Sequence, residues 1–157
     1  MQSQSPIIKS IEKSPSKIDD KWFRYSVRVQ PHHTDYAGVV WHGSYINWME
    51  EARIEYLHSI GIDHAKLTSL GCDLPVVDLS VRYHRPMRMG MVAVVRTCMK
   101  SRVSGIRLDW DYTIQSLEEQ ETYVTAQLTL VVINTQKGTI MQHLPLEIKN
   151  LLRTKSS

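Results

Sequence analysis

The feature that most constrains the fold is a stretch, residues 45–60, that contains neither Gly nor Pro and is rich in helix-favouring residues. Apolar side chains recur within it at spacings of three and four, which predicts a helix with one apolar face. Ile46, Ile54 and Leu57 broaden that face beyond an ordinary surface stripe, so we expect the helix to be largely enclosed. Gly61 is well placed to end it.

Segments typical of β-strands lie on both sides of this helix. Residues 22–30 alternate with a period of two, and Pro31 ends them. Four later segments are rich in β-branched and aromatic residues and are separated by breaks short enough for hairpins or tight connections: 76–86, 91–100, 106–115 and 122–134. A second, short helix is expected after Pro145. The order predicts an α+β fold in which one antiparallel sheet wraps around one long helix.

Length and composition fit a single globular domain of 157 residues, with 42% hydrophobic and 22% charged residues. Residues 1–20 are rich in Ser, Lys and Pro, which predicts a flexible leader before a domain at 21–153. The net charge of +3 is dispersed, which argues against a nucleic-acid partner. No apolar run has the length of a membrane span, and Cys72 and Cys98 form no CxxC. We therefore expect a cytoplasmic protein with reduced thiols and no membrane partner.

Residues 32–45, HHTDYAGVVWHGSY, form the densest cluster of polar and special residues. Asp35 lies in this loop between a strand and the helix, and Gly38 permits a tight turn. The helix start near His42 presents unpaired N–H groups and the positive end of the helix dipole, which can stabilise an oxyanion. A carboxylate opposite such an end suffices for thioester hydrolysis without a metal. From the pattern alone, a role as turn former or helix cap is the commoner one for such an Asp.

The string TDYAGVVWHGSYINWMEEAR, residues 34–53, resembles the signature of the 4-hydroxybenzoyl-CoA thioesterase family of hotdog proteins. The shared pattern is an Asp, a Gly, an apolar stretch, a His or Tyr, a Tyr three residues on, and Trp and acidic residues in the helix. In element order and spacing, the resemblance extends from Tyr25 to Leu152. It implies a hotdog fold, an acyl-CoA substrate, no cofactor, and a homo-oligomer (dimer or, more expected, tetramer) with sites at the subunit interface.

The resemblance also implies roles for individual residues. Asp35 matches the catalytic carboxylate, acting as a nucleophile or as a general base on water. His42 matches the position whose backbone N–H polarises the thioester carbonyl. Gly43, Tyr45 and Glu50 match substrate-binding positions, Tyr45 through packing and Glu50 by facing the acyl pocket in aromatic-acyl members. For Glu50, a surface role or a salt bridge with Arg53 remains the open alternative.

Coenzyme A carries several negative charges, so we expect basic residues to receive its phosphates. The candidates stand in two turns between strands: Arg85 and Arg88, and Lys100 and Arg102. Ordinary solvated charges at hairpins are the alternative reading for each of them.

Among relatives, the sequence looks closest to thioesterases for 1,4-dihydroxy-2-naphthoyl-CoA, the phylloquinone and menaquinone precursor, and the loop around Asp35 carries that resemblance. Aromatic residues near the loop could stack on a flat acyl ring: Trp41, Tyr45, Trp48 and Tyr83. Glu50 could accept a hydrogen bond from a ring hydroxyl. A generalist short-chain acyl-CoA thioesterase and a noncatalytic acyl-CoA-binding hotdog module remain alternatives.

Other readings of the histidines fit less well. His32, His33, Asp35 and His42 match no standard zinc spacing, and adjacent His residues at a strand end would point to opposite sides, so no metal is expected. The gap of seven residues from Asp35 to His42 is longer than the Asp–His gap of hotdog hydratases. The His-His motif of condensation-type acyltransferases has a longer gap before its Asp, so this chain does not match that motif.

Overall fold

The computed structural model describes residues 22–100 and 106–153. The leader expected at 1–20 lies outside this part of the chain. The elements in chain order are β1 (Phe23–Arg28), η1 (Pro31–His33), α2 (His42–Ser59), α3 (His64–Ser69), β2 (Cys72–Asp73), β3 (Val76–Tyr83), β4 (Val92–Met99), β5 (Arg107–Gln115), β6 (Thr122–Val131), β7 (Ile133–Asn134), β8 (Thr139–Ile140) and α4 (Leu146–Arg153).

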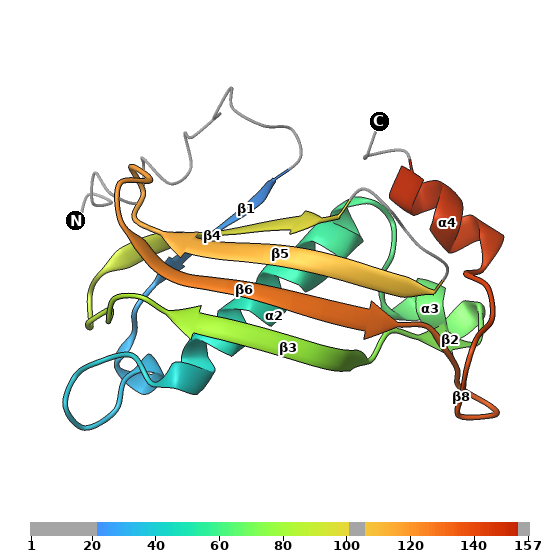
Figure 1. The fold of residues 1–157 in the computed structure, drawn as a ribbon, viewed down its shortest axis with the longest axis horizontal. Helices are drawn as coiled ribbons and strands as arrows, with labels where there is room; N and C mark the ends of the chain where they lie inside the picture. The colour runs from blue at the N-terminus through green and yellow to red at the C-terminus, as the bar shows by residue number, and fades with distance from the viewer. Residues whose placement is uncertain (1–21, 101–105, 154–157) are drawn as a thin grey trace, which may run out of the picture.

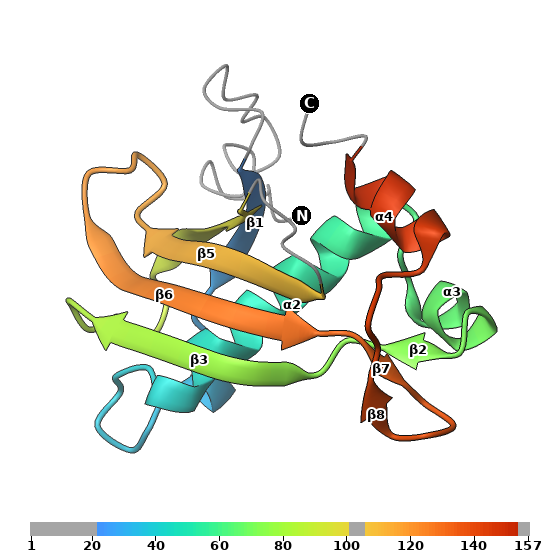
Figure 2. The ribbon, with the colours of Figure 1, turned by 45° about the vertical axis from the view of Figure 1, so that its right-hand side comes forward.

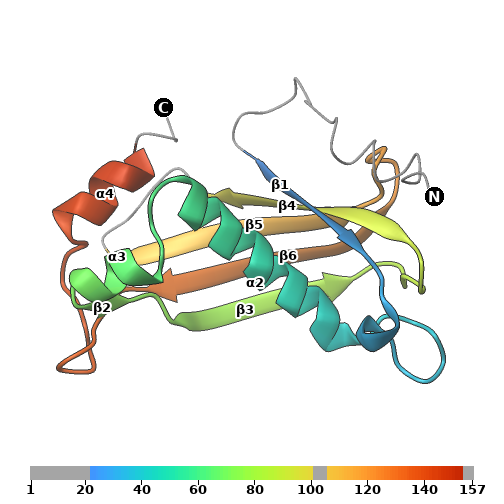
Figure 3. The ribbon, with the colours of Figure 1, turned by 180° about the vertical axis from the view of Figure 1, so that it is seen from behind.

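One five-stranded sheet, in the order β1-β4-β5-β6-β3, forms the frame of the molecule (Figure 1). Every pairing in it is antiparallel. Helix α2 crosses one face of the sheet (Figure 3), and its closest contacts are with β1 and β4. A second, small sheet, β2-β7-β8, lies with α3 and α4 beyond the end of β6 (Figure 2). These findings confirm the α+β arrangement of one antiparallel sheet around one long helix.

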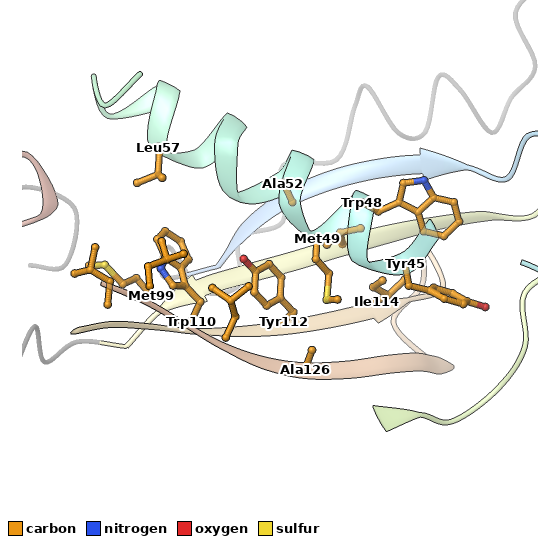
Figure 4. Packing of buried hydrophobic residues seen from close by; sticks show 14 of the residues in the cluster. Tyr45, Trp48, Met49, Ala52, Leu57, Met99, Trp110, Tyr112, Ile114 and Ala126 are labelled. Carbon is orange, nitrogen blue, oxygen red and sulfur yellow. The ribbon is translucent and has the colours of Figure 1, made fainter. Parts of the chain in front are cut away.

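The core lies between α2 and the sheet. Strand β5 alternates between buried and half-exposed positions, so that Trp110 and Tyr112 point toward the helix (Figure 4). From the helix, Met49 lies beside Tyr112 and the Tyr56 ring meets Trp110 edge to face, with centroids 5.3 Å apart. Ala52, which is fully buried, lets the two layers approach closely. Burying each large apolar side chain contributes about 1.5–3 kcal/mol. The strands therefore fix both the position and the direction of α2.

Strand β3 differs from the rest of the sheet because it is an edge strand and mostly exposed. Only Leu79 and Val81 are partly buried along it. Across from it, Ile54 of α2 is 54% exposed, so the expectation of a largely enclosed helix is wrong for this face. The cause is that α2 packs mainly against β1 and β4. Two separate cavities lie along α2 on the side toward β3, one lined by His42 and Tyr83 and the other by Leu57 and Leu74, and we call this side of the helix the trough.

Two smaller elements were not expected from the sequence. Residues 64–69, treated as connector, form α3, whose first turn is capped by the Asp63 carboxylate. The end of the last strand segment separates into β7, which pairs with β2 and β8. The second helix after Pro145 is confirmed as α4. Cys72 and Cys98 are both free thiols, as predicted. None of the helices in the described ranges is long and apolar enough to cross a membrane.

Candidate active site

The loop before α2 is organised by Asp35. One carboxylate oxygen, Oδ1, accepts hydrogen bonds from the backbone N–H of Ala37 at 2.9 Å and of Val39 at 3.4 Å. The Asp35 backbone closes the same turn, since its N–H donates to the Val39 carbonyl and its carbonyl accepts from Gly38. Gly38 has a φ of +78°, a conformation that side chains disfavour. Asp35 is therefore a turn former in part, and its exposed carboxylate is held at a fixed place.

The same loop is joined to the hairpin between β3 and β4. Val40 donates a backbone hydrogen bond to Met87, and Val39 forms a bridge with Arg88. The start of α2 is fastened from the other side, because Trp41 N–H and the Ser44 hydroxyl both donate to the His33 carbonyl at 2.9 Å. The loop and the helix start thus lie on one rigid frame, the arrangement in which loops commonly carry function.

The N-terminus of α2 is not capped by a side chain from any described residue. Trp41 occupies the N-cap position, and the N–H groups of His42 and Gly43 fall in the first turn, where no preceding helical carbonyl can accept them. The Trp41 ring lies over Gly43, where an added Cβ would come within 2.1 Å of the ring. Gly43 is thus required for the position of Trp41, and the free N–H groups carry the positive end of the helix dipole.

Asp35 and the first turn of α2 line one open cavity of about 370 Å³, which we call the Asp35 cavity. Its walls come from the loop, from the start of α2 and from the end of β3: Asp35, Val40, Trp41, His42, Tyr45, Tyr83, His84, Arg85 and Pro86. Carboxylate, helix N-terminus and an arginine thus converge on one space. A water or a thioester carbonyl between them would meet both a base and N–H donors.

Two tyrosines form the floor of this cavity. Tyr45 is buried, and its hydroxyl accepts a hydrogen bond from the Met87 N–H at 3.1 Å. Tyr83 donates its hydroxyl proton to the His42 carbonyl at 3.0 Å, and the two rings meet edge to face with centroids 5.5 Å apart. Burial raises the pKa of both phenols. Both therefore stay neutral and act as fixed apolar walls with hydrogen-bonding ends.

The adjacent histidines lie on η1 rather than on a strand end. Their rings are 4.0 Å apart between centroids, so the expectation that they point to opposite sides is wrong, because successive residues of a 3₁₀ turn do not alternate. His33 Nδ1 accepts from the Gln30 N–H at 2.8 Å. Burial, followed by the neighbouring His32, lowers the pKa of His33. Within the described ranges, no group of three His, Cys, Asp or Glu side chains could hold a metal ion.

The basic candidates separate in space. Arg85 lines the Asp35 cavity and pairs with Glu121 at 3.0 Å, and Arg88 lies beside the loop through its bridge to Val39. Lys100 follows β4 at the opposite end of the sheet, with its Nζ 3.6 Å from Asp111. Arg102 lies outside the described residues.

The remaining candidates also separate. Glu50 does not line the Asp35 cavity; it lies on the exposed face of α2 with its Oε1 3.6 Å from the Arg53 guanidinium. Trp48 is a core residue, whereas Trp41 and Tyr83 are about half exposed and line the cavity. The ion pair between Glu50 and Arg53 that the sequence offered as an alternative is present, but the burial of Arg53 was not predicted. The signal was available, since Arg53 stands four residues after Met49 on the apolar stripe.

Comparison with known proteins places this geometry in a family. Residues 29–153 match the family model of the thioesterase-like superfamily. A Synechocystis protein named "Putative esterase sll0410" is 54% identical over 128 residues, which cover 82% of this chain and 76% of that protein. The acyl-acyl carrier protein thioesterase ATL2 of Arabidopsis thaliana is 29% identical over 110 residues, covering 70% of this chain and 58% of that protein.

Among solved structures, the chain is similar to Slr0204, a 1,4-dihydroxy-2-naphthoyl-CoA thioesterase from Synechocystis. The TM-score is 0.76 at 26% identity, and the match covers 84% of this chain and 96% of that one. The chain belongs to the thioesterase-like superfamily and is a thioester hydrolase with the hotdog fold.

Proposed function

We propose that the Asp35 cavity is the active site of an acyl-CoA thioesterase for hydroxyaryl acyl groups. The first candidate substrate is 1,4-dihydroxy-2-naphthoyl-CoA of phylloquinone and menaquinone biosynthesis. The observation that carries the proposal is the convergence of the Asp35 carboxylate and the uncapped first turn of α2 on one cavity. The likeness to the Synechocystis enzyme for that substrate supports the acyl group, as do the aromatic walls formed by Trp41, Tyr45 and Tyr83.

In the proposed reaction, the thioester carbonyl accepts hydrogen bonds from the N–H of His42 at the helix start, and Gly43 keeps that turn open. Asp35 then acts in one of two ways. As a general base it takes a proton from water while the hydroxide adds to the carbonyl carbon. As a nucleophile it forms a mixed anhydride that water opens. Both routes break the C–S bond, release the CoA thiol after protonation and leave the free acid.

The coenzyme A part is assigned to the side of the cavity that carries Arg85 and Arg88. Both side chains are exposed at the hairpin beside the loop, and phosphate binding at such a place is charge-assisted. Arg85 would exchange its present partner, Glu121, for a phosphate. Lys100 would contribute only where a second copy of the chain brings it near the cavity, since it lies at the other end of the sheet.

We also propose that the enzyme is a homo-oligomer built from dimers that join along β3. The edge of β3 is unpaired within the described chain, and Val77 and Ile54 expose apolar surface on both sides of the trough. If β3 pairs antiparallel with β3 of a second protomer, the trough of that protomer runs in the opposite direction. The Asp35 cavity of one protomer would then face its partner's α2, with Glu50 near the middle of that helix. This pairing would bring Glu50 to the acyl group.

A substrate panel tests the function. Thiol release is measured from 1,4-dihydroxy-2-naphthoyl-CoA, benzoyl-CoA, acetyl-CoA and palmitoyl-CoA, and from the corresponding acyl groups on acyl carrier protein, the carrier in the name of the Arabidopsis relative. We expect kcat/KM to be highest for the dihydroxynaphthoyl thioester of CoA. A preference for palmitoyl-CoA would remove the aromatic assignment, and a preference for the carrier protein would remove the CoA assignment.

A further inference from the structure

A second cavity lies at the far end of the same trough. It has a volume of about 430 Å³ and is enclosed by the C-terminal half of α2, by α3 and by the segment between β2 and β3. We call it the Arg53 cavity. Leu57, Ile62 and Leu130 supply much of its apolar wall. The size is within the range of small-molecule sites, and nothing in the proposed chemistry at Asp35 uses it so far.

The unusual feature of this cavity is its one buried charge. Arg53 is only 6% exposed, and its guanidinium lines the cavity. Its Nη1 donates a long hydrogen bond of 3.3 Å to the Tyr112 hydroxyl, and its Nη2 is 3.6 Å from Glu50 Oε1. A guanidinium has five N–H donors, and among the described residues these are its recorded polar partners. Buried arginines normally use more of their donors, so Arg53 retains capacity for a ligand.

Charge decides which ligand fits. Four carboxylates line the cavity, Glu50, Glu55, Asp63 and Asp73, together with Arg53 and the two histidines His58 and His64. The carboxylates outnumber the basic groups, so the rim disfavours both the coenzyme A phosphates and a free acid. A plain hydrocarbon would fill the apolar wall but would leave the arginine donors unmet. A neutral group with an oxygen acceptor satisfies both conditions.

A hydroxyl is the neutral group that fits best. The Arg53 Nη2 and Glu50 Oε1 atoms are 3.6 Å apart, so one hydroxyl placed beside the pair, at hydrogen-bond distance from both atoms, can accept from the first and donate to the second. An aromatic ring carrying that hydroxyl would lie against Leu57 and Leu130. Arg53 and Glu50 together therefore present the complement of a phenol.

The distance of the Arg53 cavity from Asp35 determines which acyl group can reach it. Arg53 follows His42 by eleven residues on α2, roughly 16 Å along the helix axis, which is too far for an aryl group attached at Asp35 of the same chain. In the proposed β3-paired dimer, antiparallel pairing would turn the Arg53 cavity of one protomer toward the Asp35 cavity of the other. An aryl ring bound at one Asp35 would then extend toward the partner's Arg53.

We infer that Arg53 is a specificity-determining residue, which donates a hydrogen bond to a neutral oxygen, a ring hydroxyl, at the distal end of the acyl group. This inference rests on the proposed thioesterase function and on dimer formation along β3. Aromatic acyl groups that carry a ring hydroxyl are favoured over those without one, because a ring without a hydroxyl leaves the N–H donors of Arg53 without an acceptor.

The test compares two substrates that differ by one hydroxyl, 1,4-dihydroxy-2-naphthoyl-CoA and 1-hydroxy-2-naphthoyl-CoA. For the wild-type enzyme we expect kcat/KM to favour the first by about 30-fold, because the site contains buried polar groups that only it satisfies. In Arg53→Met the ratio of the two kcat/KM values should fall to about two, because kcat/KM for the dihydroxy substrate decreases. Arg53→Lys, which keeps one charged donor, should restore part of the ratio.

Tyr112→Phe is the matched control. It removes the hydrogen bond between Arg53 and the sheet but leaves the guanidinium, so it should lower Tm while the substrate ratio stays within twofold of wild type. If Arg53→Met does not fold, the test rests on Arg53→Lys. A kcat/KM ratio between the two substrates that equals the wild-type ratio in Arg53→Lys overturns the inference. A wild-type ratio near one also overturns it while leaving the thioesterase in place. Failure to hydrolyse any aromatic acyl-CoA would instead overturn the proposed function.

Discussion

The two ends of the trough between α2 and β3 differ in the charge they present. The Asp35 cavity has a single carboxylate, an uncapped helix start and Arg85 in its wall, with Arg88 beside it. The Arg53 cavity has an aliphatic wall, a buried guanidinium and a rim of carboxylates. The first suits an anionic, phosphate-bearing group and the second a neutral one. The contrast teaches that the two halves of an acyl-CoA suit opposite ends of α2, the first half at one protomer and the second at its partner.

The contrast matters for catalysis only if two chains join along β3, and breaking that edge should have the largest effect. Val77 is 53% exposed on β3, so Val77→Lys should leave the single chain folded while placing a charge in the edge. We expect a monomer in sedimentation and a loss of activity of about 100-fold or more. Ile140→Lys, at an equally exposed apolar position on β8, is the matched control. A dimeric and active Val77→Lys enzyme would show that β3 is not the interface.

The helix start gives the next largest effect. Gly43→Ala places a methyl group into the Trp41 ring, so the ring must move and disturb the first turn that is assigned to the carbonyl. We expect kcat to fall about tenfold with little change in KM. Trp41→Ala combined with Gly43→Ala removes the clash and should recover most of that loss. If the changes in kcat caused by the two single substitutions simply add in the double variant, Gly43 does not make room for the Trp41 ring.

Replacing the arginines at the hairpin should have a smaller effect, and it tests whether the Asp35 cavity is the end that binds the phosphates. Arg85→Ala and Arg88→Ala should each raise KM for acyl-CoA about three- to tenfold with kcat nearly unchanged, since phosphate contacts stabilise substrate and transition state alike. The increase should shrink for an acyl-pantetheine substrate, which lacks the nucleotide phosphates. Equal increases in KM for both substrates would place the coenzyme A phosphates elsewhere.

Much of the fold follows from the sequence because its signals are periodic and local. The alternation in residues 106–115 gives β5, and the apolar spacing in residues 45–60 gives most of α2. Helix α3 was missed because its six residues are too short for a periodic signal, although Asp63 offered a cap. The exposed face of α2 was missed because burial depends on the offset of the helix across the sheet. That offset is set by tertiary packing.

The site follows from the sequence less completely. The sequence predicts site residues in one loop and one turn, and the fold brings four of them to a single cavity: Asp35, His42, Tyr45 and Arg85. Glu50 is only eight residues from His42, yet it lies on a different cavity, because a helix carries its residues away along its axis. No local pattern reports that distance. Arg53 shows the reverse case, in which a charge on an apolar stripe was visible but was not taken as a signal.

The most direct measurement of the central claim is the turnover of Asp35→Asn. The amide keeps the size of the side chain and an oxygen that can still accept from the Ala37 N–H, so the loop should stay folded and Tm should change little. It is neither basic nor nucleophilic, so kcat should fall by about 1,000-fold or more on every acyl-CoA that the wild-type enzyme hydrolyses. Wild-type turnover in a folded Asp35→Asn enzyme would contradict the account and leave Asp35 as a turn former alone.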